Sequence, residues 1–271
     1  MGMAVQPADF FDALWNDFVQ IAPQAAAIRL RLEQTGERVE NDHVAFRSFA
    51  RAPIRISDLE PHFLAMGYAA LDDYVFSDKH LRARAYVQAG QPRIFLSELI
   101  VEKLSPWAQG VIEASLAHID ATRATRPDVF WAGRLWPPIA FSDYERLAEE
   151  SEYAGWLLAL GMHANHFTVS VNALSRIDSI HGILDFVESA GYPLNVSGGR
   201  VKGSAEVLLE QGSTLADRAQ VEFAGGEQHT IPTCYYEFAL RYPDASGRLY
   251  EGFVPASADR IFESTDRNPQ A

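Results

Sequence analysis

Two histidines and one glutamate have the residue types and the placement that a metal centre needs. His43 and His166 each open a short segment rich in strand-forming residues, and Glu237 lies in the middle of a third such segment. Two neutral imidazoles and one carboxylate, with coordination positions left open, are the ligand set of non-haem Fe(II) oxygenases. We therefore predict that these three residues bind one divalent metal, with Fe(II) as the first candidate.

Alternation along the third segment supports this assignment. Side chains at i and i+2 share one face of a strand. Glu237 therefore shares a face with Tyr235 and Arg241, while Tyr236 and Phe238 point to the apolar side. A buried carboxylate flanked by aromatic residues is unfavourable unless it is paired or bound to a metal. An ion pair of Glu237 with Arg241 or another cation is the structural alternative.

Two arginines are candidates for binding an acidic substrate. Arg47 follows His43 by four residues, so both lie on one face of the same expected strand. A guanidinium can donate two parallel hydrogen bonds to a carboxylate. We expect Arg47 to bind a substrate carboxylate away from the metal, with Arg241 as the second candidate. The alternatives for Arg47 are a surface charge or a structural ion pair with Glu98.

Two further residues compete for a place among the ligands. His163 precedes His166 by three residues, a spacing that would bring both to one side of a helix but to opposite faces of a strand. The strand pattern begins at His166, which favours this histidine. Glu98 is the counterpart of Glu237 in the first half of the chain, and it ranks second as the carboxylate ligand.

The order of the expected elements repeats along the chain. A helix over residues 8–34 comes first, and residues 105–160 are mostly helical. The first strand-rich part is expected to contain a strand at 42–50, a helix at 57–66 and strands at 74–77, 81–88 and 93–102. The second is expected to contain a strand at 166–172, a helix at 179–190 and strands at 200–202, 206–211, 220–223 and 233–241.

This order predicts an α+β fold built from two βαβββ modules. One module leaves a concave sheet face uncovered, and pairing two modules forms a cavity between them. We expect a single domain over residues 1–271, divided into an N-terminal helix (1–35), a first module (36–104), a helical insertion (105–160) and a second module with a C-terminal tail (161–271). The insertion is expected to cover the cavity or to form an oligomer surface.

Composition limits the possible partners and location. The 271 residues carry a net charge of −13, which argues against nucleic-acid binding because that function needs basic patches. No apolar run has the length of a transmembrane helix, so we expect no membrane partner. Cys234 is the single cysteine and cannot form an internal disulfide. A reducing, cytoplasmic location is therefore expected.

Three segments around the candidate ligands resemble one known family. They are Asn-Asp-His-Val-Ala-Phe-Arg at residues 41–47, Asn-His-Phe-Thr at 165–168 and Tyr-Glu-Phe-Ala-Leu-Arg at 236–241. With these segments the chain resembles the 2-oxoadipate dioxygenase/decarboxylase family, also called 2-hydroxyglutarate synthase or DUF1338, which has the vicinal oxygen chelate fold. The resemblance spans both modules.

This resemblance implies a reaction and roles for individual residues. His43, His166 and Glu237 would be the iron ligands, and Arg47 would hold a substrate carboxylate. The implied substrates are a 2-oxo acid, foremost 2-oxoadipate, and O2. The implied products are 2-hydroxyglutarate and CO2, formed on a route of lysine breakdown.

Two other functions are compatible with the same residues. The first is a metal-dependent isomerase or lyase of the same fold with Zn(II), Ni(II) or Mn(II), in which Glu98 would be the residue to test as a fourth ligand. The second is a non-catalytic member that binds a small ligand in the cavity. Hydrolase function is disfavoured, because neither a GxSxG elbow nor an HExxH motif occurs.

Overall fold

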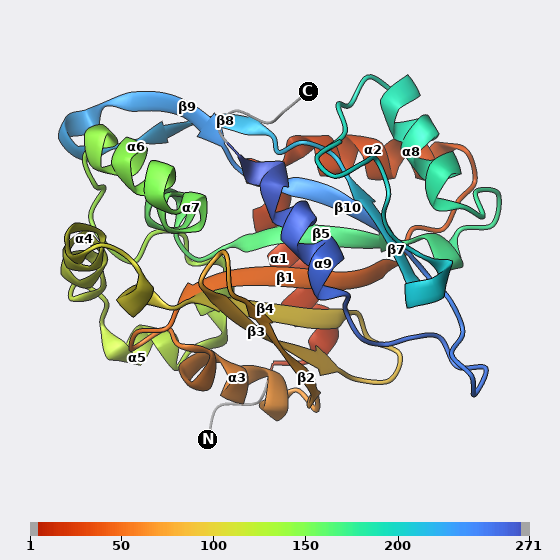
Figure 1. Cartoon of the computed structure of the whole chain (residues 1–271), viewed down its shortest axis with the longest axis horizontal. Coiled ribbons are helices and arrows are strands. Elements are labelled where there is room, and N and C mark those ends of the chain that lie inside the picture. Colours follow the sequence, from red (N-terminus) through yellow and green to blue (C-terminus); the bar gives the residue numbers. More distant parts are fainter. Residues whose placement is uncertain (1–4, 267–271) are drawn as a thin grey trace.

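One curved eight-stranded sheet organises the molecule (Figure 1). The computed structural model describes residues 5–266, and its strands follow the order β2-β3-β4-β1-β5-β10-β7-β6. They are β1 (Asn41–Phe49), β2 (Ala69–Phe76), β3 (Leu81–Val87), β4 (Arg93–Leu99), β5 (Ala164–Ser170), β6 (Lys202–Ser204), β7 (Leu209–Ser213) and β10 (Tyr235–Arg241).

The two halves of this sheet have the same topology. β1 pairs in parallel with β4, and β5 pairs in parallel with β10. The first strands of the halves, β1 and β5, pair antiparallel at the centre. Each is followed by a helix, α3 (Ile56–Ala65) or α8 (Ile180–Ser189). The predicted duplication of βαβββ modules is therefore confirmed, although the strand bounds differ from those expected.

One expected strand of the second module lies outside the main sheet. Residues 220–223 fall largely within β8 (Arg218–Glu222), which pairs with β9 (Gln228–Pro232) in a separate two-stranded sheet. The prediction that they form a strand was correct, but the prediction that this strand belongs to the module was wrong. Alternation alone does not identify the pairing partner of a strand.

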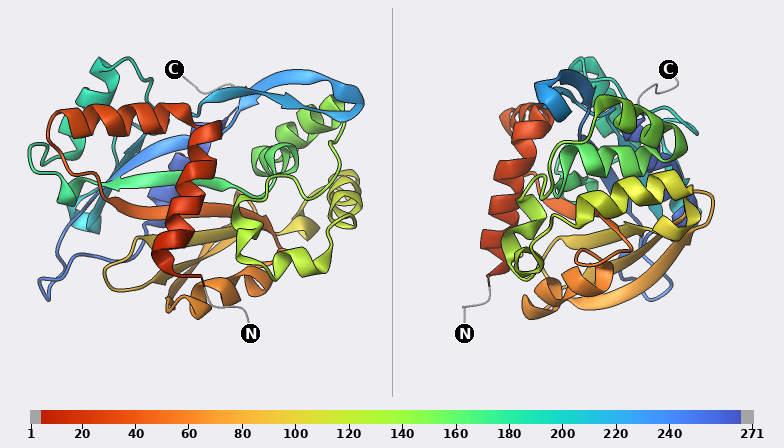
Figure 2. Two further views of the ribbon diagram at one scale, coloured as in Figure 1. Left: turned by 180° about the vertical axis from the view of Figure 1, so that it is seen from behind. Right: turned by 90° about the vertical axis from the view of Figure 1, so that its left-hand side faces the viewer.

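The N-terminal part contains two helices where one was predicted over residues 8–34. α1 (Pro7–Ile21) ends at Ala22, and α2 (Pro23–Gln34) begins at the next residue. Pro23 has no backbone N–H to continue the first helix and disfavours helical geometry at Ala22. α1 lies on the face of the sheet that is turned to the viewer in the left view of Figure 2. There Phe18 contacts Phe167 of β5 at a ring-centroid distance of 5.0 Å.

Residues 105–160 are mostly helical, as predicted, and lie at one end of the sheet (Figure 1). The last part of this segment is divided into two helices at Ser151, whose side chain accepts a hydrogen bond from the backbone N–H of Ala154 and so caps the second of them. The helices are α4 (Pro106–Leu116), α5 (Ala121–Ala124), α6 (Phe141–Glu150) and α7 (Glu152–Leu160), with a 3-10 helix η2 (Pro127–Trp131).

The segment after β10 returns across the sheet. It forms α9 (Pro255–Ile261) and the 3-10 helix η6 (Phe262–Thr265), on the face opposite α1 (Figures 1 and 2). The prediction described these residues only as a tail. The remaining short 3-10 helices are η1 (Val101–Lys103), η3 (Val171–Ala173), η4 (Ala205–Val207) and η5 (Ala224–Gly226). Among residues 5–266, no helix combines the length and apolar character needed to cross a membrane.

Candidate metal centre

The structure brings His43, His166 and Glu237 together on the face of the sheet that α9 covers. One ligand atom from each lies within 4.8 Å of the other two. Nε2 of His43 is 3.4 Å from Oε1 of Glu237, and Nε2 of His166 is 3.4 Å from Oε2. All three side chains are buried, with exposed fractions of 2%, 5% and 0%.

Sheet order explains why these distant residues meet. Their strands β1, β5 and β10 are adjacent in the sheet, and in the register of β5 with β10 His166 lies opposite Tyr235. Glu237 lies two residues beyond Tyr235 and therefore on the same face. The Tyr235 ring stacks on His166 at a centroid distance of 4.6 Å. The predicted ligand group thus follows from alternation along three neighbouring strands.

The residue before each histidine orients its ring. Nδ1 of His43 lies 2.8 Å from Oδ1 of Asp42, and Nδ1 of His166 lies 3.1 Å from Oδ1 of Asn165. An oxygen acceptor at Nδ1 favours the tautomer that donates there and leaves Nε2 free to ligate a metal. Sequence reasoning did not assign these roles to Asp42 and Asn165. The signal was the shared pattern of a carboxylate or amide residue immediately before each histidine.

Arg241 holds Asp42 in place. Its Nε and Nη2 donate to the two Asp42 carboxylate oxygens at 2.7 and 2.8 Å, and its Nη1 donates to the backbone carbonyls of Tyr250 and Gly252. Burial favours a higher pKa for Asp42, but Arg241 and His43 outweigh it and hold the pKa well below its usual range. The three guanidinium nitrogens of Arg241 are all engaged in this network. It therefore does not form the alternative ion pair with Glu237, and the geometry disfavours the predicted role of Arg241 in substrate binding.

Glu237 has one oxygen that suits a metal ligand. Its Oε1 accepts a hydrogen bond of 2.6 Å from Nε2 of Gln211, whereas its Oε2 has no hydrogen-bond partner among the described residues. Burial raises the pKa of Glu237, with the His43 ring opposing that effect. Leaving such a carboxylate oxygen unpaired is unfavourable, and a bound cation would compensate it. Sequence reasoning missed Gln211, whose position in β7 is next to β10 only in the folded sheet.

The histidines are suited to metal binding as well. Burial lowers the pKa of His166 well below its usual value, and the neighbouring His43 and Arg47 add to the effect. His166 is therefore neutral, the form that ligates metals. Oγ1 of Thr168 lies 3.1 Å from Nε2 of His43, within hydrogen-bond distance. Two neutral imidazoles and one carboxylate fit a divalent metal that keeps open coordination positions.

The competing ligands lie elsewhere. Oε2 of Glu98 accepts a hydrogen bond of 2.6 Å from the backbone N–H of Ile56 at the start of α3, and its Oε1 pairs with Arg82. Nδ1 of His163 lies 2.7 Å from Oδ2 of Asp17 in α1. Neither residue belongs to the ligand group found in residues 5–266.

Arg47 is buried beside the metal centre, and its ion-pair partner is not Glu98, the residue considered from the sequence. Its Nη1 donates to Oε2 of Glu152 at 3.2 Å, and its Nη2 donates to Oγ1 of Thr265 at 2.7 Å. The alternative pairing with Glu98 is thus wrong. The guanidinium carbon lies 5.0 and 4.9 Å from the ring centroids of Tyr153 and Trp156. These contacts keep a charged group in place within the protein.

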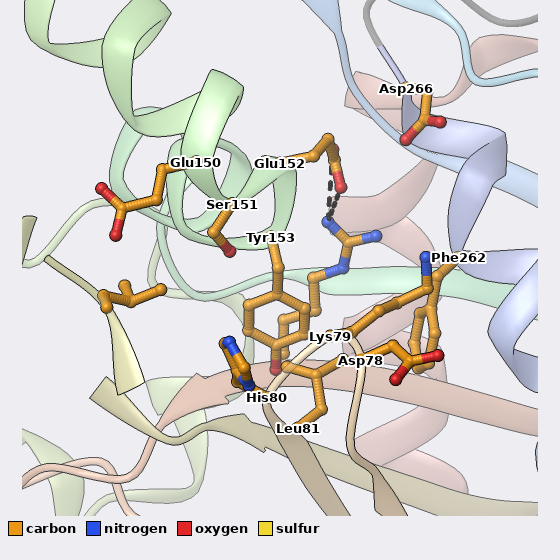
Figure 3. A pocket seen from close by; sticks show the side chains of 12 residues that line it. Asp78, Lys79, His80, Leu81, Glu150, Ser151, Glu152, Tyr153, Phe262 and Asp266 are labelled. Carbon is orange, nitrogen blue, oxygen red and sulfur yellow. Dashed lines mark hydrogen bonds and ion pairs between the residues drawn. The ribbon is translucent and has the colours of Figure 1, made fainter. Parts of the chain in front are cut away.

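Two cavities meet at this point. The metal pocket, lined by the three ligands together with Phe95, Gln211, Phe253, Ala258, Ile261 and Phe262, has a volume of about 20 Å³. The outer cavity, lined by Arg47 and by residues of α7, η6 and the β2–β3 turn, has a volume of about 220 Å³ (Figure 3). Phe262 lines both cavities, so the metal pocket and the outer cavity adjoin at this residue.

The sequence of the chain matches one family model and is similar to named proteins of that family. The family model described as 2-oxoadipate dioxygenase/decarboxylase matches residues 14–130 and 121–248. The 2-oxoadipate dioxygenase/decarboxylase of Oryza sativa subsp. japonica is 36% identical over 258 residues, which cover 86% of this chain and 71% of the relative.

Two solved structures extend the comparison. The hydroxyglutarate synthase of Oryza sativa, solved in complex with 2-oxoadipate, is 32% identical with a TM-score of 0.89 and covers 97% of this chain and 94% of that one. A glyoxalase superfamily protein of Ralstonia eutropha JMP134 is 22% identical with a TM-score of 0.73 and covers 91% and 85% of the two chains. The second likeness confirms the predicted fold class.

Proposed function

Because the chain belongs to the 2-oxoadipate dioxygenase/decarboxylase family, we propose that it uses one Fe(II) ion to convert 2-oxoadipate and O2 into 2-hydroxyglutarate and CO2. The observation that carries this proposal is the convergence of His43, His166 and Glu237, with an unpaired carboxylate oxygen at the point where they meet. The relative solved with 2-oxoadipate supports the choice of substrate.

Each ligand has a defined part in this reaction. When bound, the metal would supply open coordination positions for a 2-oxo acid and O2 and the electrons that activate O2. His43 and His166 contribute no charge, and Glu237 contributes one negative charge, so the centre keeps a net positive charge that attracts an acid. Asp42 and Asn165 keep both imidazole rings oriented, and Gln211 holds one oxygen of Glu237 so that the other is directed at the metal.

The apolar wall of the metal pocket has a second role. Phe95, Phe253 and Ile261 surround the ligands, and the pocket has room for roughly one water molecule. Excluding bulk water protects reactive species from side reactions and strengthens the interactions of the ligands with charged groups. Ile261 ends α9 and Phe262 begins η6. The C-terminal segment, which lies over the sheet, therefore contributes part of this apolar wall.

Arg47 would bind the far carboxylate of the substrate. 2-Oxoadipate has one carboxylate beside its keto group and a second at the other end of a three-carbon chain. With the first at the metal, the second would reach towards the outer cavity, which Arg47 lines. Nε of Arg47 is buried and has no hydrogen-bond partner among the described residues. The stacked rings of Tyr153 and Trp156 hold this guanidinium in place for the carboxylate.

O2 uptake tests the proposal. Anaerobically purified protein is loaded with Fe(II) and mixed with 2-oxoadipate and O2, while O2, CO2 and 2-hydroxyglutarate are measured; His166→Ala serves as the control. We expect equal amounts of O2 consumed and CO2 released, 2-hydroxyglutarate as the product, and loss of all three signals in the variant. A wild-type protein that binds one metal but consumes no O2 would exclude the dioxygenase reaction and direct the search to redox-neutral chemistry.

A further inference from the structure

The charges around Arg47 do not match a simple carboxylate-binding site. Acidic residues outnumber basic ones in the wall of the outer cavity (Figure 3). The acidic residues are Asp78, Glu150, Glu152 and Asp266; the basic ones are Arg47 and Lys79, with His80 beside them. A dicarboxylic acid that enters this cavity therefore approaches a surface that already carries negative charge.

Glu152 is the acidic residue in direct contact with Arg47. Its two oxygens lie 3.5 and 3.2 Å from Nη1 of Arg47, shown by the dashed lines in Figure 3. It is the first residue of α7, directly after the capping residue Ser151, so the backbone at this position is fixed. Removal of its carboxyl from water raises the pKa of Glu152, with Arg47 opposing this effect. The opposite charges of Glu152 and Arg47 stabilise each other, because an unpaired buried guanidinium would be strongly unfavourable.

The guanidinium of Arg47 is buried, and one of its nitrogens has no hydrogen-bond partner among the described residues. Glu152 occupies Nη1, Thr265 occupies Nη2 through a hydroxyl, and Nε has no partner among the described residues. A carboxylate can bind side-on to Nε and Nη2 with two parallel hydrogen bonds. In that geometry it replaces only the Thr265 contact, and Glu152 stays on Nη1. Two carboxylates would then share one guanidinium, and they would repel each other.

We propose that Glu152 is a specificity-determining residue that lowers the affinity of the site for 2-oxo acids with a second carboxylate. The inference rests on the proposed function, because it takes Arg47 as the group that binds the far carboxylate. Glu152 pairs with Arg47 while the site is empty. It lowers the affinity of Arg47 for the far carboxylate of the substrate and of the dicarboxylic product. Weaker binding of the substrate and the product favours product release after the reaction. Binding the substrate and the transition state equally tightly does not raise kcat.

The test compares Glu152→Gln with the wild type on two acids of equal length. 2-Oxoadipate has the far carboxylate, and 2-oxohexanoate has a methyl group in its place. Glutamine keeps an oxygen that accepts from Nη1, so it removes the charge and preserves the contact.

Dissociation constants are measured anaerobically by calorimetry with Fe(II)-loaded protein, and KM values are measured in air. We expect binding of 2-oxoadipate to tighten by about tenfold, the effect of removing one like charge at contact distance in a partly screened site. Binding of 2-oxohexanoate should change less than about twofold.

Glu60→Gln is the matched control. Glu60 is a half-buried glutamate paired with Arg84 at 3.0 Å, and its side chain is 21% exposed against 22% for Glu152. It belongs to α3, away from both cavities that meet at Phe262. We expect Glu60→Gln to leave the binding of both acids unchanged, while thermal unfolding reports the structural effect of each substitution.

The possible outcomes separate this inference from the proposed function. Equal weakening of both acids by Glu152→Gln, or no change for either, would overturn the inference, because a residue that only supports Arg47 does not distinguish them. A wild type that neither binds nor turns over 2-oxoadipate would overturn the proposed function, and this inference with it. Tighter binding confined to the dicarboxylic acid, and absent in the control, would support the proposed role of Glu152.

Discussion

Arg241 of β10 forms a bidentate ion pair with Asp42 of β1, through bonds of 2.7 and 2.8 Å between residues 199 positions apart in the chain. Asp42 also faces Nδ1 of His43 at 2.8 Å. The last strand of the second module therefore orients a candidate metal ligand of the first. This relationship gives Arg241 a positioning role and leaves Arg47, whose buried Nε has no hydrogen-bond partner among the described residues, as the candidate for substrate binding.

Replacing Asp42 by asparagine should reduce stability in a pH-dependent manner. The neutral amide would leave Arg241 buried without a counter-charge, at a cost of about 3–5 kcal/mol near neutral pH. The pKa of Asp42 is held below its usual range, so the stabilisation is present above the ordinary aspartate pKa of about 3.9 and is lost as pH falls through the folded-state value. Urea unfolding of the metal-free wild type and Asp42→Asn over a pH series measures the difference. A gap that stays constant down to the acid transition would contradict this account.

Replacing Glu237 by glutamine should abolish metal binding without destabilising the metal-free protein. The buried carboxylate has an unpaired oxygen, so removing its charge relieves an unfavourable interaction. We expect a stability equal to or about 1 kcal/mol above that of the metal-free wild type. Metal content by elemental analysis and thermal unfolding with and without added metal measure both effects.

Glu98→Gln is the informative control for that variant. Glu98 is also buried, but it accepts from the backbone N–H of Ile56 and pairs with Arg82. We expect its replacement to lower stability and to leave one metal bound per chain. Loss of metal in Glu98→Gln would instead make Glu98 a fourth ligand and favour the isomerase or lyase alternative.

Replacing Arg47 by glutamine should raise the KM for 2-oxoadipate by about 100-fold, because a bidentate charge-assisted contact is worth roughly 3 kcal/mol. Metal content should not change, since Arg47 is not a ligand. Steady-state kinetics on 2-oxoadipate and 2-oxohexanoate give the measurement, and only the first acid should be affected. Arg82→Gln, which changes a more exposed arginine paired with Glu98, is the control. An unchanged KM would remove Arg47 from the substrate site.

Replacing Phe262 by alanine should open the metal pocket to larger molecules. The ring lines both the metal pocket and the outer cavity, so its removal joins volumes of about 20 and 220 Å³. We expect a bulky chelator such as 2,2′-bipyridine to extract Fe(II) at least about tenfold faster from the variant, a change of about 1.4 kcal/mol in barrier. The absorbance of the iron complex follows the rate. Phe223→Ala, a buried truncation near the β8–β9 hairpin, controls for general loosening; equal acceleration in both variants would refute this role of Phe262.

Local signals predicted the modules and their helices well. Alternation in the segments at 42–50, 166–172 and 233–241 identified three strands, and the same alternation selected the polar face that holds the ligands. Proline at position 23 was a strong local signal that the prediction did not use, and it divides the predicted N-terminal helix. Element type depends on neighbouring residues, so it can be inferred without knowledge of the fold.

Contacts between distant residues were the part that local signals did not predict. Arg241, the second candidate for substrate binding, binds Asp42, and the partner of Arg47 is Glu152. The hairpin position of residues 220–223 and the return of α9 over the metal pocket were equally absent from the prediction. Each of these features depends on which strands become neighbours in the sheet and on the path of the loops between them.

The sequence by itself therefore determined the types of the candidate ligands, their faces and the duplicated element order, because these follow from residue chemistry and from the two-residue period of a strand. The tertiary structure decided which charges pair, which oxygen of Glu237 remains free, and how Phe262 and Arg47 divide the space beside the metal. Those properties arise from side chains that meet only when the strands have assembled in the order β1-β5-β10-β7 and the C-terminal segment has closed over them.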